Sequence, residues 1–372
     1  MRGGLQLEPQ QHGVIDQAFL QAHSHRIGGV DELQGVYLAG SWSKPQWLRL
    51  GDAEANRLVS SLHRTISIAV LDLRYNNISD NGTIVLAKLL KDPYTLTTLN
   101  LSYNNIGAKG AQAIAQAMHD NVSLQKLILS GNPLSNEGGV AISSMLLRNH
   151  ALCDLDLGHC DLGLRGLVAV TTAAACHPNL ITLCLDRPLL FCHEVRNAGE
   201  HVYRLLSSST LHLHKLSLAH VGLRHDDTSR LCEALACNRT IRDLDLCCNQ
   251  IAQDGAFALG KVLALDTPLR FLKLSRNQVK DPGVWALAAG LTNNRHLLTL
   301  ALQSNEVTGE GLAFLERAMK RNNTLRDLYI WGNTLDNTAC QARALFLCVD
   351  YAQHVSQSLS TDYVVFLSAV YV

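Results

Sequence analysis

The chain has 372 residues and carries 32 basic and 32 acidic side chains, so its formal net charge is zero. This balance argues against nucleic acid or an anionic membrane as the main partner, because both favour proteins with a strong positive field. Residues 1–10 lack the apolar core of a secretory signal, and no apolar run reaches the roughly 18 residues that a membrane span needs. Together with 11 cysteines, an odd number, this predicts reduced thiols in a cytoplasmic protein.

The N-terminal part of the chain is irregular. We predict that residues 1–64 form a cap with one degenerate repeat, made of a short strand at 36–38 and a helix at 53–62. Trp42 and Trp47 are expected to cover apolar surface, because the first unit of a repeat array would otherwise leave it exposed to water.

From residue 65 to residue 339, a 28-residue period organises the sequence. Each unit repeats the pattern of Leu71-x-Leu73-x-x-Asn76-x-Ile78. A period of this length indicates a solenoid, in which each unit contacts mainly its neighbours and about ten units share one core. The aligned asparagines are Asn76, Asn104, Asn132, Asn249, Asn277, Asn305 and Asn333.

The unit that starts at Leu96 shows the expected local structure. Leu99-Asn100-Leu101 alternates with period two and predicts a short strand, and residues 110–118 have helical periodicity. The Asn104 amide is expected to bond the backbone of the neighbouring turn, and Asn121 to end the helix in a left-handed conformation. Alternating strands and helices stack as a parallel sheet with helices on one side. Because helices are wider than strands, the sheet should line the concave face of a horseshoe.

The repeated L-x-x-L-x-L-x-x-N/C-x-L pattern resembles the ribonuclease-inhibitor type of leucine-rich repeat. The predicted fold is therefore an α/β leucine-rich repeat solenoid with a parallel concave sheet and outer helices. Residues 328–333, with the sequence Leu-Tyr-Ile-Trp-Gly-Asn, and Cys340 resemble one branch of this family more closely, whereas the segment after Phe346 departs from it. The resemblance implies an intracellular protein, located on a ciliary axoneme or in the nucleolus.

The period is interrupted near the middle of the chain. Leu183 and Leu216 are 33 residues apart, and the five extra residues fall within 188–209. Nine of the 16 histidines and five cysteines lie between residues 150 and 225. Two interpretations of the inserted segment are open, a contact loop and a tolerated insertion. The asparagine position of the three central units holds Cys160, Pro188 and Val221.

The central side chains include metal-ligand types, but not at the spacing of a known site. No C-x₂₋₄-C pair occurs among them, so we predict reduced thiols, no metal and no cofactor. The sequence also has no phosphate-binding loop, G-x-S-x-G elbow or H-E-x-x-H motif, and we predict that the protein is not an enzyme. The central ligand types are His159, Cys160, Cys176, His177, Cys184, Cys192 and His193.

Side chains that flank the inward-pointing leucines are predicted to line the concave face. Among them Arg74, Asp156 and Asp245 are candidate partner-binding charges. The competing interpretation is that such charges pair along the sheet, where side chains of adjacent strands are within reach of each other, and contribute little to stability. The expected pairs are Lys126–Asp154, Lys215–Asp243 and Asp245–Lys273.

Aromatic residues mark two further candidate contact sites. Tyr329 and Trp331, with Phe271, are expected at the C-terminal end of the concave face, where aromatic anchors favour protein binding. Tyr75 and Tyr103 occupy equivalent turns in adjacent repeats, and we expect their rings to stack.

Residues 340–372 are predicted to form the C-terminal cap. Residues 363–372 carry no charge and favour β structure, so they either close the sheet or offer an edge to a partner. In the competing interpretation, the cap covers Tyr329 and Trp331.

These features predict a non-enzymatic intracellular scaffold that binds a protein partner within a larger assembly such as the ciliary axoneme. The alternative is a regulator of an enzyme, an activator of small GTPases or an inhibitor, that acts through the concave face. The zero net charge argues against inhibition of a basic ribonuclease. We expect neither nucleic acid nor membrane as a partner.

Overall fold

The computed structural model describes residues 24–26, 34–41, 49–62, 68–91, 96–265 and 267–334. Its strands form one 12-stranded sheet in sequence order, in which only β1 and β2 pair antiparallel. The strands are β1 Ser24–Arg26, β2 Gln34–Tyr37, β3 Ile68–Asp72, β4 Thr98–Asn100, β5 Lys126–Ile128, β6 Asp154–Asp156, β7 Thr182–Cys184, β8 Lys215–Ser217, β9 Asp243–Asp245, β10 Phe271–Lys273, β11 Thr299–Ala301 and β12 Asp327–Tyr329.

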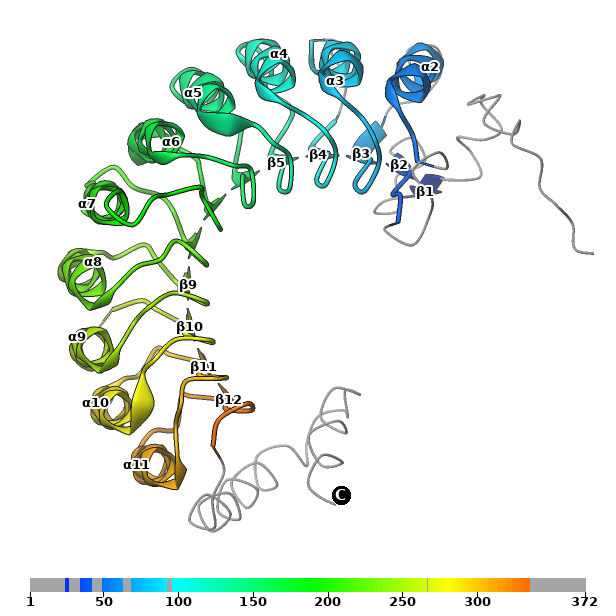
Figure 1. The fold of residues 1–372 in the computed structure, drawn as a ribbon. Helices are drawn as coiled ribbons and strands as arrows, with labels where there is room; N and C mark the ends of the chain where they lie inside the picture. Colours follow the sequence, from blue (N-terminus) through cyan, green and yellow to red (C-terminus); the bar gives the residue numbers. More distant parts are fainter. Residues whose placement is uncertain are drawn as a thin grey trace, which may run out of the picture.

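A helix follows almost every parallel strand, and all the helices lie on the outer side of an open arc whose inner side is the sheet (Figure 1). The predicted horseshoe is therefore confirmed. The helices are α2 Asp52–Leu62, α3 Asp80–Leu86 with the 3₁₀ turn η2 Ala87–Leu90, α4 Ala108–Met118, α5 Ser135–Leu146, α6 Leu164–Cys176, α7 Val195–Leu206, α8 His225–Cys237, α9 Gln253–Ala264, α10 Lys280–Asn293 and α11 Gly309–Met319.

The core is a continuous stack between sheet and helices. Leu99 and Leu101 of the β4 unit are 2 % and 0 % exposed, and the same leucines recur in the other units. From α4 the buried residues include Ala111, Ile114 and Met118, spaced so that one face of the helix meets the sheet. Full burial of one such leucine contributes about 1.5–3 kcal/mol, so the repeated leucines hold the stack together.

The asparagines at the equivalent position of the regular repeats form a hydrogen-bonded ladder, as predicted for Asn104. Its amide nitrogen donates to the carbonyl oxygens of Leu73 and Leu101, both at 3.0 Å. Its amide oxygen accepts the backbone N–H of Ile78 at 3.1 Å. In the irregular central units Cys160 takes this place, and its thiol donates to the Leu129 carbonyl at 3.2 Å.

The prediction for Asn121 is wrong. This residue does not adopt a left-handed conformation, and its side chain is buried. Its amide nitrogen donates to the Leu90 carbonyl at 2.8 Å, and its amide oxygen accepts the Leu124 N–H at 2.8 Å. The residue thus joins the end of one helix to the chain that returns to the next strand, in a second ladder. The other asparagines of this ladder are Asn149, Asn238, Asn294 and Asn322.

The structure narrows the position of the five extra residues. Leu162 and Leu190 are one regular period apart, whereas Gly166 and Gly199 are separated by 33 residues. The insertion therefore lies between Leu190 and Gly199, in the loop that leads into α7 and in the first turn of that helix.

The N-terminal prediction of a strand and a helix agrees with β2 and α2, which extend the sheet and the helix layer by one unit. Trp42, Trp47 and the predicted C-terminal cap at 340–372 lie outside the described residues. Within the described part of the chain, no helix combines the length and apolar character needed to cross a membrane.

Candidate protein-binding site

The concave face is built from side chains that alternate with the buried leucines along each strand. Several carboxylates of this face also accept hydrogen bonds from the backbone of the turn that follows their strand. Asp156 accepts the Gly158 N–H at 3.0 Å, and Asp245 accepts the Cys247 N–H at 3.0 Å. Such short-range side-chain bonds satisfy backbone donors at the end of a strand. Asp156 and Asp245 therefore have a structural role whether or not they contact a partner.

Ion pairs connect neighbouring strands across this face. Lys215 lies 3.5 Å from Asp243, and Lys273 lies 3.1 Å from Asp245, as expected. Burial opposes the charge of Lys273, but the carboxylates of Asp245 and Asp243 outweigh it and raise the pKa of the lysine.

Two other basic residues of this face, Lys126 and Arg74, differ from these inter-strand pairs. Among the ion pairs of the described residues, none joins Lys126 to Asp154, so this expected pair is wrong. Arg74 pairs instead with Asp72 of its own unit at 3.3 Å. Most charges of the face are thus matched within the protein, and they add little driving force for binding.

Aromatic side chains are exposed at the C-terminal end of the concave face. Tyr329 is 41 % exposed and Trp331 is 53 % exposed. Their backbone carbonyls accept the N–H groups of Leu302 at 2.7 Å and Ser304 at 3.1 Å, so the sheet fixes the position of both residues. Tyr329 ends β12, and Trp331 begins the turn that follows it, two residues further along the chain.

Phe271 does not join this pair of aromatic residues. The sheet register aligns it with Thr299 and then with Asp327, so two strand spacings, about 10 Å, separate Phe271 from β12. Phe271 is 38 % exposed and stands as an isolated apolar contact point.

Tyr75 and Tyr103 form the predicted stack, with ring centroids 4.7 Å apart and planes at 10°. Both residues have left-handed backbones, with φ of 59° and 55°. The next residue in this row is Gly131, where a side chain would meet the Tyr103 ring, since an added Cβ would lie 2.4 Å from Tyr103 Cδ1. The stack is therefore a rigid platform of two rings beside the concave sheet.

Two of the central thiols, those of Cys160 and Cys184, lie in surroundings that suppress their reactivity. Burial raises the pKa of the Cys160 thiol to about 12, and it also raises the pKa of the Cys184 thiol. Both groups stay protonated near neutral pH, and a protonated thiol is neither a good nucleophile nor a good metal ligand.

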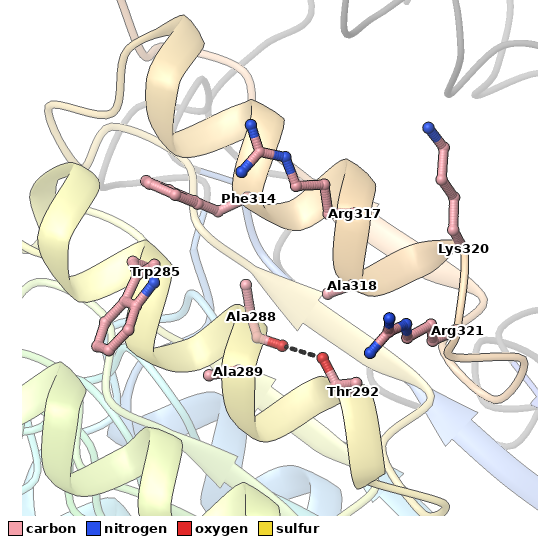
Figure 2. A pocket seen from close by; sticks show the side chains of 9 residues that line it. All are labelled: Trp285, Ala288, Ala289, Thr292, Phe314, Arg317, Ala318, Lys320 and Arg321. Carbon is pink, nitrogen blue, oxygen red and sulfur yellow. Dashed lines mark hydrogen bonds between the residues drawn. The ribbon is translucent and has the colours of Figure 1, made fainter.

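A hollow on the convex side was not anticipated from the sequence. It lies between α10 and α11, has a volume of about 490 Å³, and is bordered by Trp285 and Phe314 at one end and by Lys320 and Arg321 at the other (Figure 2). Arg317 lies over the Phe314 ring, 5.7 Å from its centroid. The sequence signal was the recurrence of large aromatic residues at equivalent helix positions, Phe257 and Trp285, whose rings meet edge to face at 5.8 Å.

Seven segments match the family model described as Leucine Rich repeat, and the chain belongs to the leucine-rich repeat proteins. No segment between residues 170 and 237 is matched, although the structure continues the strand and helix alternation through this part. The matched segments are 67–87, 95–115, 120–143, 148–170, 237–260, 266–288 and 293–315.

Among individual proteins, the chain is similar to Leucine-rich repeat-containing protein 34 of Mus musculus, with 38 % identity over 95 residues. The match spans 26 % of this chain and 22 % of the mouse protein. This match confirms the narrower resemblance to one branch of the family that the sequence suggested.

Two solved structures extend the comparison to more of the chain. A yeast complex of Rad7 and Elc1 aligns over 78 % of each chain, with 15 % identity and a TM-score of 0.49. An internalin of Listeria monocytogenes aligns over 82 % of each chain, with 17 % identity and a TM-score of 0.41.

Proposed function

We propose that the protein is a scaffold that binds another protein through its concave face, with Tyr329 and Trp331 as the main anchors. The observation that carries this proposal is the exposure of both rings on a strand end that the sheet holds in place. Repeat solenoids present extended concave surfaces, and family membership favours a protein-interaction role.

The distribution of charge supports the choice of these anchors. Lys215, Lys273 and Arg74 are already paired with carboxylates of the same face, so a partner would have to replace existing ion pairs to use them. By contrast, Ala301 is the residue that the sheet places opposite Tyr329 on the adjacent strand. A small neighbour leaves the Tyr329 ring accessible, and aromatic rings bury a large area at little cost in side-chain entropy.

The test is a double substitution, Tyr329→Ala with Trp331→Ala. Binding partners that are recovered with the wild-type protein should be lost, because removal of each anchor residue weakens binding by about thirtyfold. The matched control is Phe257→Ala with Trp285→Ala, which removes similar aromatic area from the convex side. Both variants should keep the circular dichroism of the wild type. Equal recovery of partners by the Tyr329/Trp331 variant and the wild type would refute the proposal.

The finer part of the proposal is membership in a large assembly such as the ciliary axoneme. It is supported only by the family resemblance of the sequence. Proximity labelling with the tagged protein in ciliated cells tests it, and the matched convex-side variant serves again as the control. A reproducible change in GTP hydrolysis by members of a panel of small GTPases would favour the enzyme-regulator alternative instead.

A further inference from the structure

One backbone feature recurs in every regular turn and creates a row of side chains that the proposed function does not use. The residue just before the asparagine position has a positive φ in each of ten units, between 51° and 76°. These residues are Tyr75, Tyr103, Gly131, His159, Arg187, His220, Cys248, Arg276, Ser304 and Gly332.

The fold imposes this conformation irrespective of the side chain. A left-handed backbone costs a non-glycine residue about 1 kcal/mol. The cost is offset because the N–H of each turn residue donates to the next unit, as in the bonds from Arg187 to the Ala219 carbonyl at 2.8 Å and from His220 to the Cys247 carbonyl at 3.0 Å. The side chains at this position are therefore free to vary, and they line up along the edge of the sheet.

In the central units this row is cationic. His159, Arg187, His220 and Arg276 are all exposed, with Cys248 between the last two. At about 4.8 Å for each strand spacing, the row runs for about 19 Å. Within the described part of the chain, no ion pair engages any of these four side chains.

The cationic side chains lie close enough to influence one another. Burial, together with the positive charges of Arg187, His159 and Arg276, lowers the pKa of His220, and Asp186 acts in the opposite direction. The Asp186 carboxylate is itself bonded, since one of its oxygens accepts the Ser217 hydroxyl at 2.7 Å and the Ala219 N–H at 2.8 Å. Arg187 and Arg276 thus carry positive charges that no ion pair of the described residues neutralises.

The loop that leads from Arg187 to α7, which includes the insertion, carries exposed apolar side chains. Leu189 and Phe191 follow Arg187 by two and four residues and are 61 % and 71 % exposed. The Phe191 ring stacks on His193 at 5.8 Å, and the Leu189 N–H donates to the Leu162 carbonyl at 2.8 Å, so the loop is anchored to the preceding repeat. Exposed apolar side chains held in this way are typical of contact sites.

We propose that the cationic row and the inserted loop together bind an extended acidic segment of a partner protein. Carboxylates of that segment would pair with Arg187 and Arg276 and accept hydrogen bonds from the imidazoles of His159 and His220. An apolar side chain of the segment would pack on Leu189 and Phe191. This second binding surface is independent of the aromatic anchors at Tyr329 and Trp331.

A peptide fits this surface better than a nucleic acid does. Asp156, Asp186 and Asp245 face the adjoining sheet, and they would repel a backbone with a phosphate at every position. A peptide can instead place its carboxylates only where they meet the cations, with an apolar residue between them. The net charge of zero agrees with a partner of this kind.

The test measures binding of a fluorescent peptide with glutamates at alternate positions and one central leucine, at low ionic strength. Arg187→Asn with Arg276→Asn should weaken binding about fivefold, because two exposed ion pairs are lost. Asparagine tolerates the left-handed backbone, so the turns are kept. The matched control, Arg242→Asn with Arg270→Asn, removes two exposed arginines at the opposite ends of the strands and should bind as the wild type does.

One further measurement completes the test. Phe191→Ser should weaken binding of the leucine peptide but not of a peptide with serine in its place. Three outcomes would each overturn the proposal. They are wild-type affinity in the Arg187/Arg276 variant, an equal loss of affinity in the control variant, and tighter binding of a single-stranded oligonucleotide than of the peptide.

Discussion

Substitution of Asn104 by alanine offers a quantitative test of the asparagine ladder. The change removes the bonds from its amide nitrogen to the Leu73 and Leu101 carbonyls, a longer one to the Ser102 carbonyl at 3.3 Å, and the bond that its amide oxygen accepts from Ile78. The Ser102 carbonyl keeps the bond from the Tyr75 N–H. Both leucine carbonyls keep a second partner, because Asn76 also donates to Leu73 and Asn132 also donates to Leu101. The Ile78 N–H has no such substitute among the described hydrogen bonds.

The expected loss of stability follows from which groups keep a hydrogen-bond partner. Each of the two shared carbonyls loses one bond at a net cost of about 1 kcal/mol, and the buried Ile78 N–H left without a partner costs about 1–3 kcal/mol. We therefore expect Asn104→Ala to destabilise the protein by about 3–5 kcal/mol. Cys160→Ala removes one main thiol bond from the same ladder position and should cost only about 1 kcal/mol.

Urea unfolding followed by circular dichroism measures both changes. Asn104→Cys, which copies the residue found naturally at position 160, should lie between the alanine variant and the wild type because it keeps one donor. Repeat arrays can lose their terminal units separately, so the N-terminal and central units need separate probes. A loss for Asn104→Ala no larger than that for Cys160→Ala would refute the ladder argument.

Two other predictions concern helix packing and pH. Gly260→Ala should destabilise the protein by about 2 kcal/mol, because an added Cβ would lie 2.4 Å from the Ala286 carbonyl oxygen. Gly51→Ala should be nearly neutral, since its Cβ would meet only the flexible Glu54 side chain at 3.3 Å. Thermal unfolding compares the two variants, and equal stabilities would contradict the packing argument. Burial lowers the pKa of His177, so the unfolded chain binds more protons and stability is lost as the pH falls below about 6.5. His177→Asn should reduce this acid sensitivity when unfolding is followed at several pH values, and an unchanged pH profile would show that His177 is not its source.

Features that repeat within each unit could be predicted from the sequence. The 28-residue period specified strands, helices and their order, and with them the horseshoe. Asn104 could be assigned to a ladder because its bonds join positions that the period itself aligns. The Tyr75 and Tyr103 stack was predictable for the same reason, since both occupy equivalent turns of adjacent units.

The tertiary structure decided what depends on contacts between units that the pattern does not encode. Asn121 lies just beyond a helix. At that position an asparagine can end the helix or bond to the neighbouring unit, and the sequence does not distinguish the two roles. Only the stacking of the units brings the Leu90 carbonyl to the Asn121 amide. The hollow between α10 and α11 likewise follows from how neighbouring helices pack.

The central cationic row shows this division most clearly. The sequence by itself determined that histidines are concentrated between residues 150 and 225. The period also places His159, Arg187 and His220 at equivalent turns, since each directly precedes the asparagine position. Only the structure shows that these side chains are exposed and that the turns share a left-handed backbone and bond to one another. A repeat specifies its own strand and helix through local hydrophobic spacing, whereas the surface of the solenoid is set by the side chains that stacking brings together.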